Sequence, residues 1–207
     1  MLFNKDYPSA RYLTMTTNRS TALLLLILSS FFLSACSSVI SISRDKPIGE
    51  NYGKRTTGAF VDDQLIETKA KVNLKKSDER FKPAQVTVNS FNGVVLITGN
   101  VSDSDMRAIA TKTVSKIRKV RRVNNELNVS PPRSNSAKLA DAWLSRKVKT
   151  RFLFSKDVDS NRVKVVVNDG VIFLMGLVSH AEADSIVEST KKAYGLQKIV
   201  RVFEYID

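Results

Sequence analysis

Residues 86–102, VTVNSFNGVVLITGNVS, and residues 163–179, VKVVVNDGVIFLMGLVS, are two copies of one pattern. At a constant offset of 77 residues the following residues of the first copy meet the same residue type in the second: Val86, Val88, Gly93, Val94, Gly99, Val101 and Ser102. In each copy an apolar run meets Asn-Gly or Asp-Gly, which supply the positive φ angles of a tight β-hairpin. Gly99 and Gly176 follow near the end of the second strand, where we expect them to permit a turn. Each stretch therefore predicts a hairpin.

The segments around the two hairpins repeat as well, which makes the unit about 70 residues long. A helix is predicted upstream, because the following residues lie at helical spacing and correspond at an offset of 78: Asp63, Ile66, Ala70 and Leu74 with Asp141, Leu144, Val148 and Phe152. A second helix follows each hairpin, with an N-terminus predicted at Ser102 or Ser179 and, in the first unit, an apolar face of Met106, Ala110, Val114 and Ile117. The segments RVNNELNV (122–129) and KIVRVFEY (198–205) predict a last strand.

The predicted fold class is therefore α+β, with two tandem α-β-β-α-β domains. We place the first domain at residues 59–130, a linker at 131–137 and the second domain at 138–207. The strands GVVLI and GVIFLM are apolar on both sides, which indicates that both faces of each sheet are covered. The helices of one unit cover only one face, so the other face is expected to pack against the partner unit or another chain.

Residues 1–35 have the layout of a secretory signal peptide, with Arg19, an apolar core and small residues before Cys36. Met15 is the better candidate for the start, because residues 1–14 add nothing to this layout. The apolar core is shorter than the roughly 20 residues that cross a bilayer. Leu33-Ser34-Ala35-Cys36 resembles the lipobox of bacterial lipoproteins, in which the cysteine is acylated. The alternative is a short membrane anchor whose cysteine is incidental.

Residues 36–58 are polar with scattered glycines, and they predict a lipidated N-terminus followed by a flexible tether. By resemblance to lipoproteins of bacteria with two membranes, Ser37 and Ser38 imply sorting to the outer membrane. The formal charge is +13 for the chain and about +11 without residues 1–35. A basic mature protein favours anionic partners, which are nucleic acid or anionic lipid.

The segment NGVVLITGNVS (92–102), followed by a helix and a strand, resembles the BON domain, and so does its second copy. The resemblance covers about residues 60–130 and 138–207. It implies a non-enzymatic lipoprotein, anchored in the outer membrane and facing the periplasm, that binds anionic phospholipid and supports outer-membrane integrity. The second copy departs from the pattern at Lys191, where an apolar residue is expected opposite Val114.

The first helix of the second unit carries two apolar faces. Leu144, Val148 and Phe152 are expected to face the sheet, at about 100° per residue. The candidate phospholipid-binding residues lie on the other side of the helix: Leu139, Trp143, Arg146, Lys147, Thr150 and Phe154. Apolar side chains fringed by cations suit a bilayer interface. The alternative is that Trp143 and Phe154 pack against the first unit or the linker.

The matching helix face of the first unit is interpreted as polar, with Glu67 and Lys71 near it, so only the second unit is expected to bind lipid.

Three other functions were weighed against lipid binding. The basic segment KTVSKIRKVRR (112–122) could follow phosphates, but it lacks the interleaved aromatic residues of a nucleic-acid surface. An enzyme would need to use Asp62, Asp63, Asp103, Asp105 or His180, and the aspartates are interpreted as charges at helix starts. No metal, cofactor or small-molecule substrate is predicted. The serious alternative is a protein-interaction module that binds an outer-membrane assembly or division-site protein without recognising lipid.

Overall fold

The computed structural model describes residues 53–194 and 198–207. The predicted signal peptide, Met15, Cys36 and the tether up to residue 52 lie outside the described residues.

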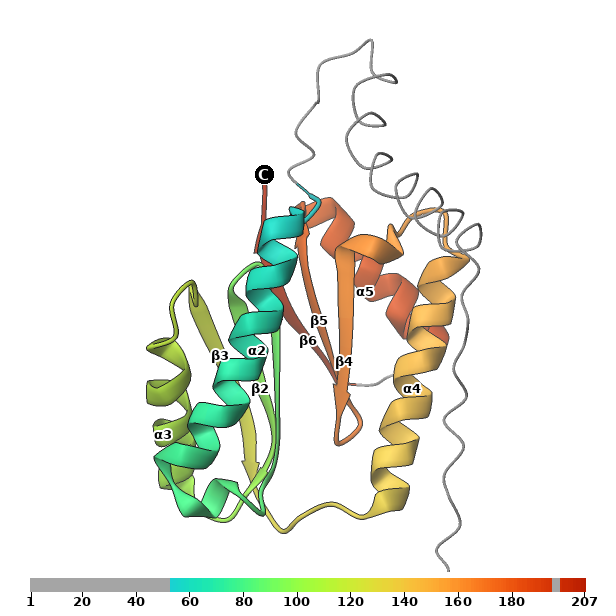
Figure 1. Cartoon of the computed structure of the whole chain (residues 1–207). Helices are drawn as coiled ribbons and strands as arrows, with labels where there is room; N and C mark the ends of the chain where they lie inside the picture. Colours follow the sequence, from blue (N-terminus) through green and yellow to red (C-terminus); the bar gives the residue numbers. More distant parts are fainter. Residues whose placement is uncertain (1–52, 195–197) are drawn as a thin grey trace, which may run out of the picture. The chain divides into compact units, whose positions relative to one another are not determined.

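The described chain forms two α-β-β-α-β domains, as the repeat predicts (Figure 1). The elements of the first domain are α2 (Thr57–Ser77), β1 (Gln85–Phe91), β2 (Val94–Val101), α3 (Ser104–Ser115) and β3 (Arg122–Val129), with a 3-10 turn η1 (Glu79–Phe81). Those of the second are α4 (Asn135–Leu153), η2 (Ser160–Arg162), β4 (Val163–Asn168), β5 (Val171–Val178), α5 (His180–Tyr194) and β6 (Ile199–Tyr205).

Each sheet has three strands and mixed topology. The central strand, β2 or β5, pairs antiparallel with the strand before it and parallel with the last strand of its domain. In the first domain α2 packs mainly on β1 and α3 mainly on β3. The two helices of a domain therefore cover the same face of its sheet.

The hairpin turns have the predicted backbone. Asn92 and Gly93 have φ angles of 51° and 75°, and Asp169 and Gly170 have φ angles of 54° and 72°. Two successive positive φ angles match the right-handed twist of the strands they join.

Gly99 and Gly176 do not form turns, so that prediction is wrong. Gly99 lies inside β2 opposite Val86, with a φ of 127°, and a Cβ there would be 1.9 Å from the carbonyl oxygen of Gln85. Gly176 lies inside β5 opposite Val163, where a Cβ would be 2.6 Å from a backbone oxygen. The glycines allow the first strand of each hairpin to approach closely.

The predicted cap of the second helix is correct in one domain and wrong in the other. The amide of Glu182 donates to Ser179 Oγ at 3.2 Å, and Ser179 N donates back to Glu182 Oε2 at 2.8 Å, which is a capping box. In the first domain the N-cap is Asp103 rather than Ser102, and its side chain makes no capping bond.

The inner face of the second helix also differs in detail from the prediction. Ile117 is buried, but it follows the end of α3. In α5 the inner position is filled by Thr190, whose hydroxyl donates to the Ile186 carbonyl at 2.7 Å, and Lys191 is exposed. A buried hydroxyl bonded to its own helix thus replaces the expected apolar residue.

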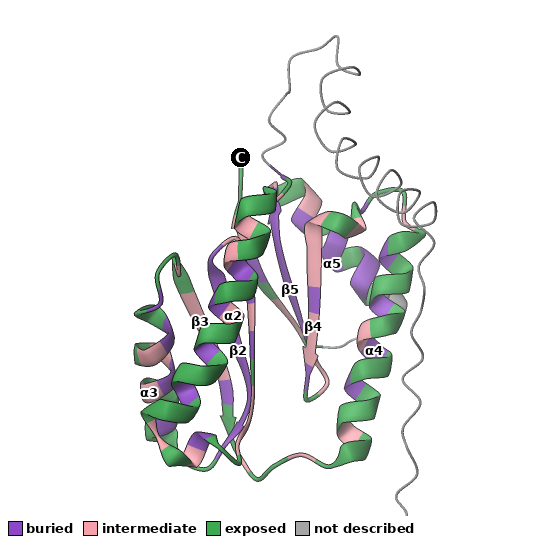
Figure 2. Ribbon diagram, viewed as in Figure 1, coloured by how far each residue is buried: buried purple, intermediate pink, exposed green. Residues whose placement is uncertain are grey.

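Each domain has its own core between helices and sheet, and a third core joins the two sheets. Figure 2 shows that buried residues run along the strands of the two sheets. Val95 and Ile97 of β2 face α2 and α3, whereas their neighbours Val94 and Leu96 belong to the third core. That core contains Phe91, Val94, Leu96, Phe173, Met175, Leu177 and Val202. The strands are apolar on both sides because the second face of each sheet packs against the other domain.

Polar contacts surround this third core. Glu204 of β6 accepts a hydrogen bond from Asn92 Nδ2 at 3.0 Å and forms an ion pair with Arg121. Lys164 of β4 lies 2.6 Å from Glu67 Oε1 of α2. Ion pairs between the two domains therefore lie at the edges of the third core.

Candidate functional site

Helix α4 presents a face that points away from its own sheet. Its buried residues are Asp141, Leu144, Val148 and Phe152, as the helical spacing predicts. On the other side Leu139 is 72% exposed, Trp143 60% and Phe154 84%. Arg146, Lys147 and Thr150 are exposed as well, so the six predicted residues share one surface, here called the α4 stripe.

The α4 stripe combines apolar and cationic groups in direct contact. The ammonium of Lys147 lies 5.0 Å from the centroid of the Trp143 ring, which is a cation–π distance. Leu153, 68% exposed, also lies on this side of the helix, and the sequence reasoning missed it. At about 100° per residue Leu153 lies about 40° from Leu139 around the helix, and this angle is the sequence signal that would place it beside the α4 stripe.

The alternative for Trp143 and Phe154 is packing against the first domain or the linker. The apolar core between the domains is built from strand residues, and neither aromatic side chain belongs to it. More than half of each side chain's surface is open. The large apolar side chains of the α4 stripe are therefore mostly exposed.

The matching face of α2 is not polar, so that prediction is wrong. Glu67 is turned toward the sheet edge, where its Oε1 accepts from Ser90 N at 2.8 Å and from Lys164. The exposed large apolar side chains of α2 are Phe60, Val61, Leu65 and Val72. The offset of 78 that aligns the buried residues of the two helices places Val61, Leu65 and Val72 at the positions of Leu139, Trp143 and Thr150.

One aspartate in each domain attaches the first helix to the hairpin turn. Asp141 accepts from the amides of Asp169 and Gly170 at 2.8 and 2.9 Å and forms an ion pair with Arg133. This contact orients α4 on its sheet and so decides which side of the helix faces outward.

Asp63 has the same role in the first domain. It lies in the second turn of α2 and is fully buried, so its interpretation as a helix-start charge is wrong. It accepts hydrogen bonds from Asn92 N, Gly93 N, Ser90 Oγ and Arg55 Nη1, at 2.6 to 2.9 Å. Burial raises the pKa of Asp63, but these hydrogen bonds together outweigh burial and hold the pKa below its usual value.

The other acidic groups and the histidine are used in surface contacts. Asp62 pairs with Lys119 at 2.5 Å, and Asp103 and Asp105 pair with Arg80 at 3.2 and 2.7 Å. His180 Nδ1 lies 2.7 Å from Asp207, and its exposed ring stacks on Tyr205. Within residues 53–194 and 198–207, no group of three or more His, Cys, Asp and Glu side chains could hold a metal ion.

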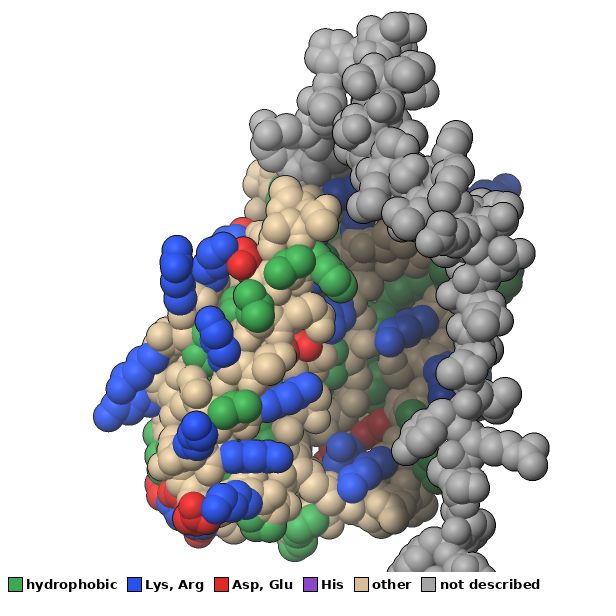
Figure 3. Space-filling model, in the orientation of Figure 1, with side chains coloured by type: hydrophobic (Ala, Val, Ile, Leu, Met, Phe, Trp, Pro, Cys, Tyr) green, Lys and Arg blue, Asp and Glu red, His purple; other side chains and the backbone are tan. Residues whose placement is uncertain are grey.

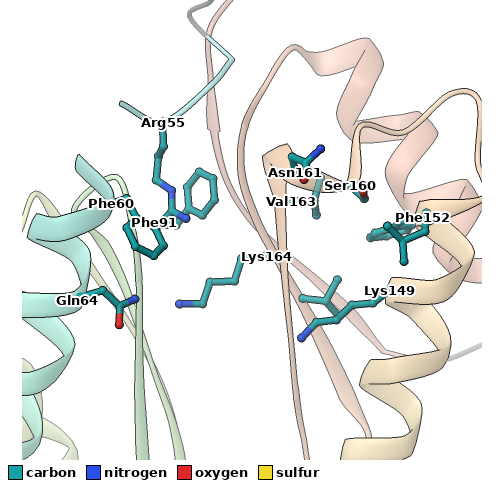
Figure 4. Close-up of a pocket in the computed structure, with 12 residues that line it drawn as sticks. Arg55, Phe60, Gln64, Phe91, Lys149, Phe152, Ser160, Asn161, Val163 and Lys164 are labelled. Atoms are coloured by element: carbon teal, nitrogen blue, oxygen red, sulfur yellow. The ribbon is translucent and has the colours of Figure 1, made fainter. Parts of the chain in front are cut away.

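A cavity of about 490 Å³ lies beside the start of α2 and the end of α4 (Figure 4). Its walls include the aromatic rings of Phe60, Phe91 and Phe152. The guanidinium of Arg55 lies 4.2 Å from the Phe91 ring centroid and is paired with Asp63. The other charged side chains among the described residues that line the cavity are those of Lys149 and Lys164.

The basic segment 112–122 contributes to internal contacts. Lys119 pairs with Asp62, Arg121 pairs with Glu204, and Arg122 donates to the Phe203 carbonyl at 2.9 Å. These three cations hold elements of the fold together and do not form a continuous free row for nucleic-acid phosphates.

The remaining predicted site residue, Cys36, lies outside the described residues. Among the helices that the structure does describe, none combines the length and the apolar character that spanning a bilayer requires.

Comparisons with known proteins agree with the architecture. The family model of the BON domain matches residues 62–131 and 140–207. The outer membrane lipoprotein DolP of Haemophilus influenzae is 31% identical over 93% of this chain and 100% of its own length. The 21 kDa hemolysin of Actinobacillus pleuropneumoniae is 27% identical over 73% of this chain and 78% of its own. The osmotically-inducible protein Y of Escherichia coli is 29% identical over 69% of this chain and 72% of its own.

Both repeats of the sequence are thus matched by one family model, and the Haemophilus lipoprotein aligns over its full length with 93% of this chain. The chain belongs to the BON-domain family and is a non-catalytic outer-membrane lipoprotein built from two BON domains.

Proposed function

We propose that this protein is anchored in the outer membrane through acylated Cys36, faces the periplasm, and binds anionic phospholipid through the α4 stripe of its second BON domain. By holding the folded domains on the bilayer surface it supports outer-membrane integrity. The observation that carries the lipid assignment is the exposure of Leu139, Trp143 and Phe154 beside Arg146 and Lys147.

The chemistry of the α4 stripe fits a bilayer interface. Tryptophan is favoured at the level of the headgroups, where its ring is partly in hydrocarbon and its N–H remains hydrated. Each Lys or Arg near an anionic leaflet contributes about 1 kcal/mol, and the long stems of these residues can lie along the apolar surface. Apolar contact and electrostatic attraction therefore act on the same face of one helix.

The lipid anchor and the α4 stripe have different roles. Two or three acyl chains at Cys36 would attach the protein durably, because each buried CH₂ adds about 0.8 kcal/mol. The anchor does not orient the domains, since a polar stretch separates Cys36 from α2. Binding through α4 would fix one face of the second domain against the membrane.

The test uses residues 37–207, which contain every described residue but not the acylation site. Co-sedimentation is measured with phosphatidylglycerol and with phosphatidylcholine vesicles, at low and at high salt. Binding to the anionic vesicles alone, weakened by salt, is the expected result, because salt screens exposed charges beyond about 10 Å at 0.1 M.

The double variant Trp143→Ala/Lys147→Glu should bind phosphatidylglycerol vesicles at least about tenfold more weakly, since it removes the largest apolar side chain and reverses a charge. Lys138→Glu is the control, because Lys138 is exposed on α4 away from the stripe and the variant reverses one charge as well. Equal binding by the wild type and the double variant would refute the site. Vesicle binding that does not depend on the lipid composition would favour a protein-interaction module instead.

A further inference from the structure

The offset of 78 residues that aligns the buried faces of α2 and α4 also aligns their outer faces. Ile66, Ala70 and Leu74 correspond to Leu144, Val148 and Phe152, and all six are buried. By the same offset the α4 stripe residues Leu139, Trp143, Lys147 and Thr150 correspond to Val61, Leu65, Lys69 and Val72. The first domain therefore has apolar residues and a lysine at the equivalent positions.

These residues are exposed in the structure. Val61 is 51% exposed, Leu65 49% and Val72 46%, and we call these three residues the α2 stripe. At about 100° per residue they fall within about 40° of one another, roughly on the opposite side of α2 from its buried face. Figure 3 shows hydrophobic side chains interspersed with lysines and arginines on this face of the molecule.

The charged side chains around the α2 stripe are lysines, because the carboxylates of α2 are in ion pairs elsewhere. Lys69 and Lys76 lie on one side of it and Lys75 on the other, each within about 60° of its centre, and all three are exposed. The carboxylates of α2 are otherwise engaged: Asp62 with Lys119, Asp63 with Arg55 and the hairpin turn, and Glu67 with Lys164. The helix thus offers unopposed cations beside an apolar strip.

We infer that the α2 stripe is a second contact with anionic phospholipid, so that both BON domains touch the membrane. The inference rests on the proposed function of the α4 stripe. A bilayer surface supplies what this face lacks, which is an apolar phase for Val61, Leu65 and Val72 and phosphate charge for the lysines on both sides. Amphipathic helices with apolar and cationic residues insert their apolar face shallowly, at the boundary between lipid headgroups and acyl chains.

A second contact changes how the protein binds. The third core joins the two domains, so contact of one stripe with the bilayer would keep the other close to the same surface, and two weak contacts would give stronger attachment than either alone. The α2 stripe lacks an aromatic residue at the position of Trp143, so we expect it to be the weaker of the two contacts.

The experiment places a fluorescent reporter on the α2 stripe. Leu65→Trp is introduced together with Trp143→Phe into residues 37–207, so that the only tryptophan stands at the position equivalent to Trp143. Emission is recorded with phosphatidylglycerol vesicles that contain lipids brominated along the acyl chain, which quench a tryptophan that reaches them. Asn73→Trp with Trp143→Phe is the control, because Asn73 is exposed on α2 about 100° from the stripe centre.

We expect a blue shift and quenching for Leu65→Trp and neither for Asn73→Trp, together with about fivefold weaker vesicle binding for each of Lys69→Glu and Lys76→Glu. The unaltered chain, with Trp143 as reporter, separates the two proposals. Quenching of Trp143 without quenching of Leu65→Trp would refute the α2 contact and leave the α4 contact standing. No quenching at either position would refute both, and equal quenching of Leu65→Trp and Asn73→Trp would refute a contact specific to the stripe.

Discussion

Asp63 and Asp141 show how one side chain can determine the geometry of a repeat. Each is a buried carboxylate on the first helix of its domain, and it accepts hydrogen bonds from the two backbone amides of the hairpin turn. Those amides point outward from a turn with positive φ angles and have no partner within the hairpin. The aspartate accepts hydrogen bonds from these amides. It thereby fixes how α2 or α4 is rotated on its sheet, and so which side of that helix faces outward.

Replacing Asp63 by Asn should destabilise the first domain by about 2–4 kcal/mol. The amide of Asn retains one acceptor oxygen and brings an N–H₂ group toward donors, so buried amides lose their partner. Urea unfolding followed by circular dichroism measures the change. Asp62→Asn is the matched control, because its exposed pair with Lys119 should contribute less than about 1 kcal/mol. Equal effects of the two variants would contradict this role.

The same carboxylate should make stability depend on pH in the acid range. The folded-state pKa of Asp63 is below its unfolded value, so its contribution is complete above an unfolded pKa of about 3.9 and disappears as the pH falls through the folded pKa. The difference in unfolding free energy between wild type and Asp63→Asn should therefore narrow below about pH 4. A difference that stays constant down to pH 2 would exclude Asp63 as its source.

Within the strands, the spacing between neighbours depends on the absence of a side chain at Gly99. Gly99→Ala should cost more than about 2 kcal/mol, because the new Cβ would overlap the Gln85 carbonyl and the φ of 127° disfavours any side chain. Gly58→Ala is the opposite case, since its Cβ would meet only Thr56 Oγ1 at 3.8 Å within α2. It should be neutral or stabilise by up to about 1 kcal/mol. Thermal unfolding of both variants tests the contrast.

Helices α2 and α4 each carry two faces with different roles. The inner faces build the domain cores and the outer faces carry apolar residues with cations. An outer apolar strip that only filled space would be replaceable by polar residues without cost. Contact with the membrane would give the outer faces of both helices a use for these apolar residues.

In the whole molecule, the sheets of the two domains are joined through the third core. Leu96 of the first domain is fully buried there, beside residues of β5 and β6. The unfolding of one domain should therefore depend on the other. A cooperative unit of this kind would hold the two proposed membrane contacts in a defined relation to each other.

Leu96→Ala should lower the unfolding midpoint reported by Trp143, although Trp143 lies in the other domain, because the cavity removes about 2–5 kcal/mol of packing between them. Urea titration followed by Trp143 fluorescence measures this midpoint. Val88→Ala extends the test, since Val88 faces only the core of the first domain and should also lower the Trp143 midpoint if the two domains unfold together. An unchanged Trp143 midpoint in Leu96→Ala would show that the domains unfold independently.

The order of the elements could be predicted from the sequence because it depends on local patterns. The Asn-Gly and Asp-Gly turns, the period of the helices and the alternation of the strands act over a few residues, and the repeat allowed each to be checked against its copy. The α4 stripe was located in the same way, since its six residues follow from helical angles alone. The same helical angles, with the offset of 78 between the two helices, also place the α2 stripe opposite the buried face of α2.

The sequence by itself determined two α-β-β-α-β units, the inner faces of their first helices and the surface chemistry of α4. Only the tertiary structure decided that Asp63 binds a turn 29 and 30 residues away, that Gly99 makes room for a neighbouring strand, and that the second face of each sheet packs against the other domain. These contacts join residues far apart in the chain. They depend on which surfaces meet after folding, and no local periodicity encodes that.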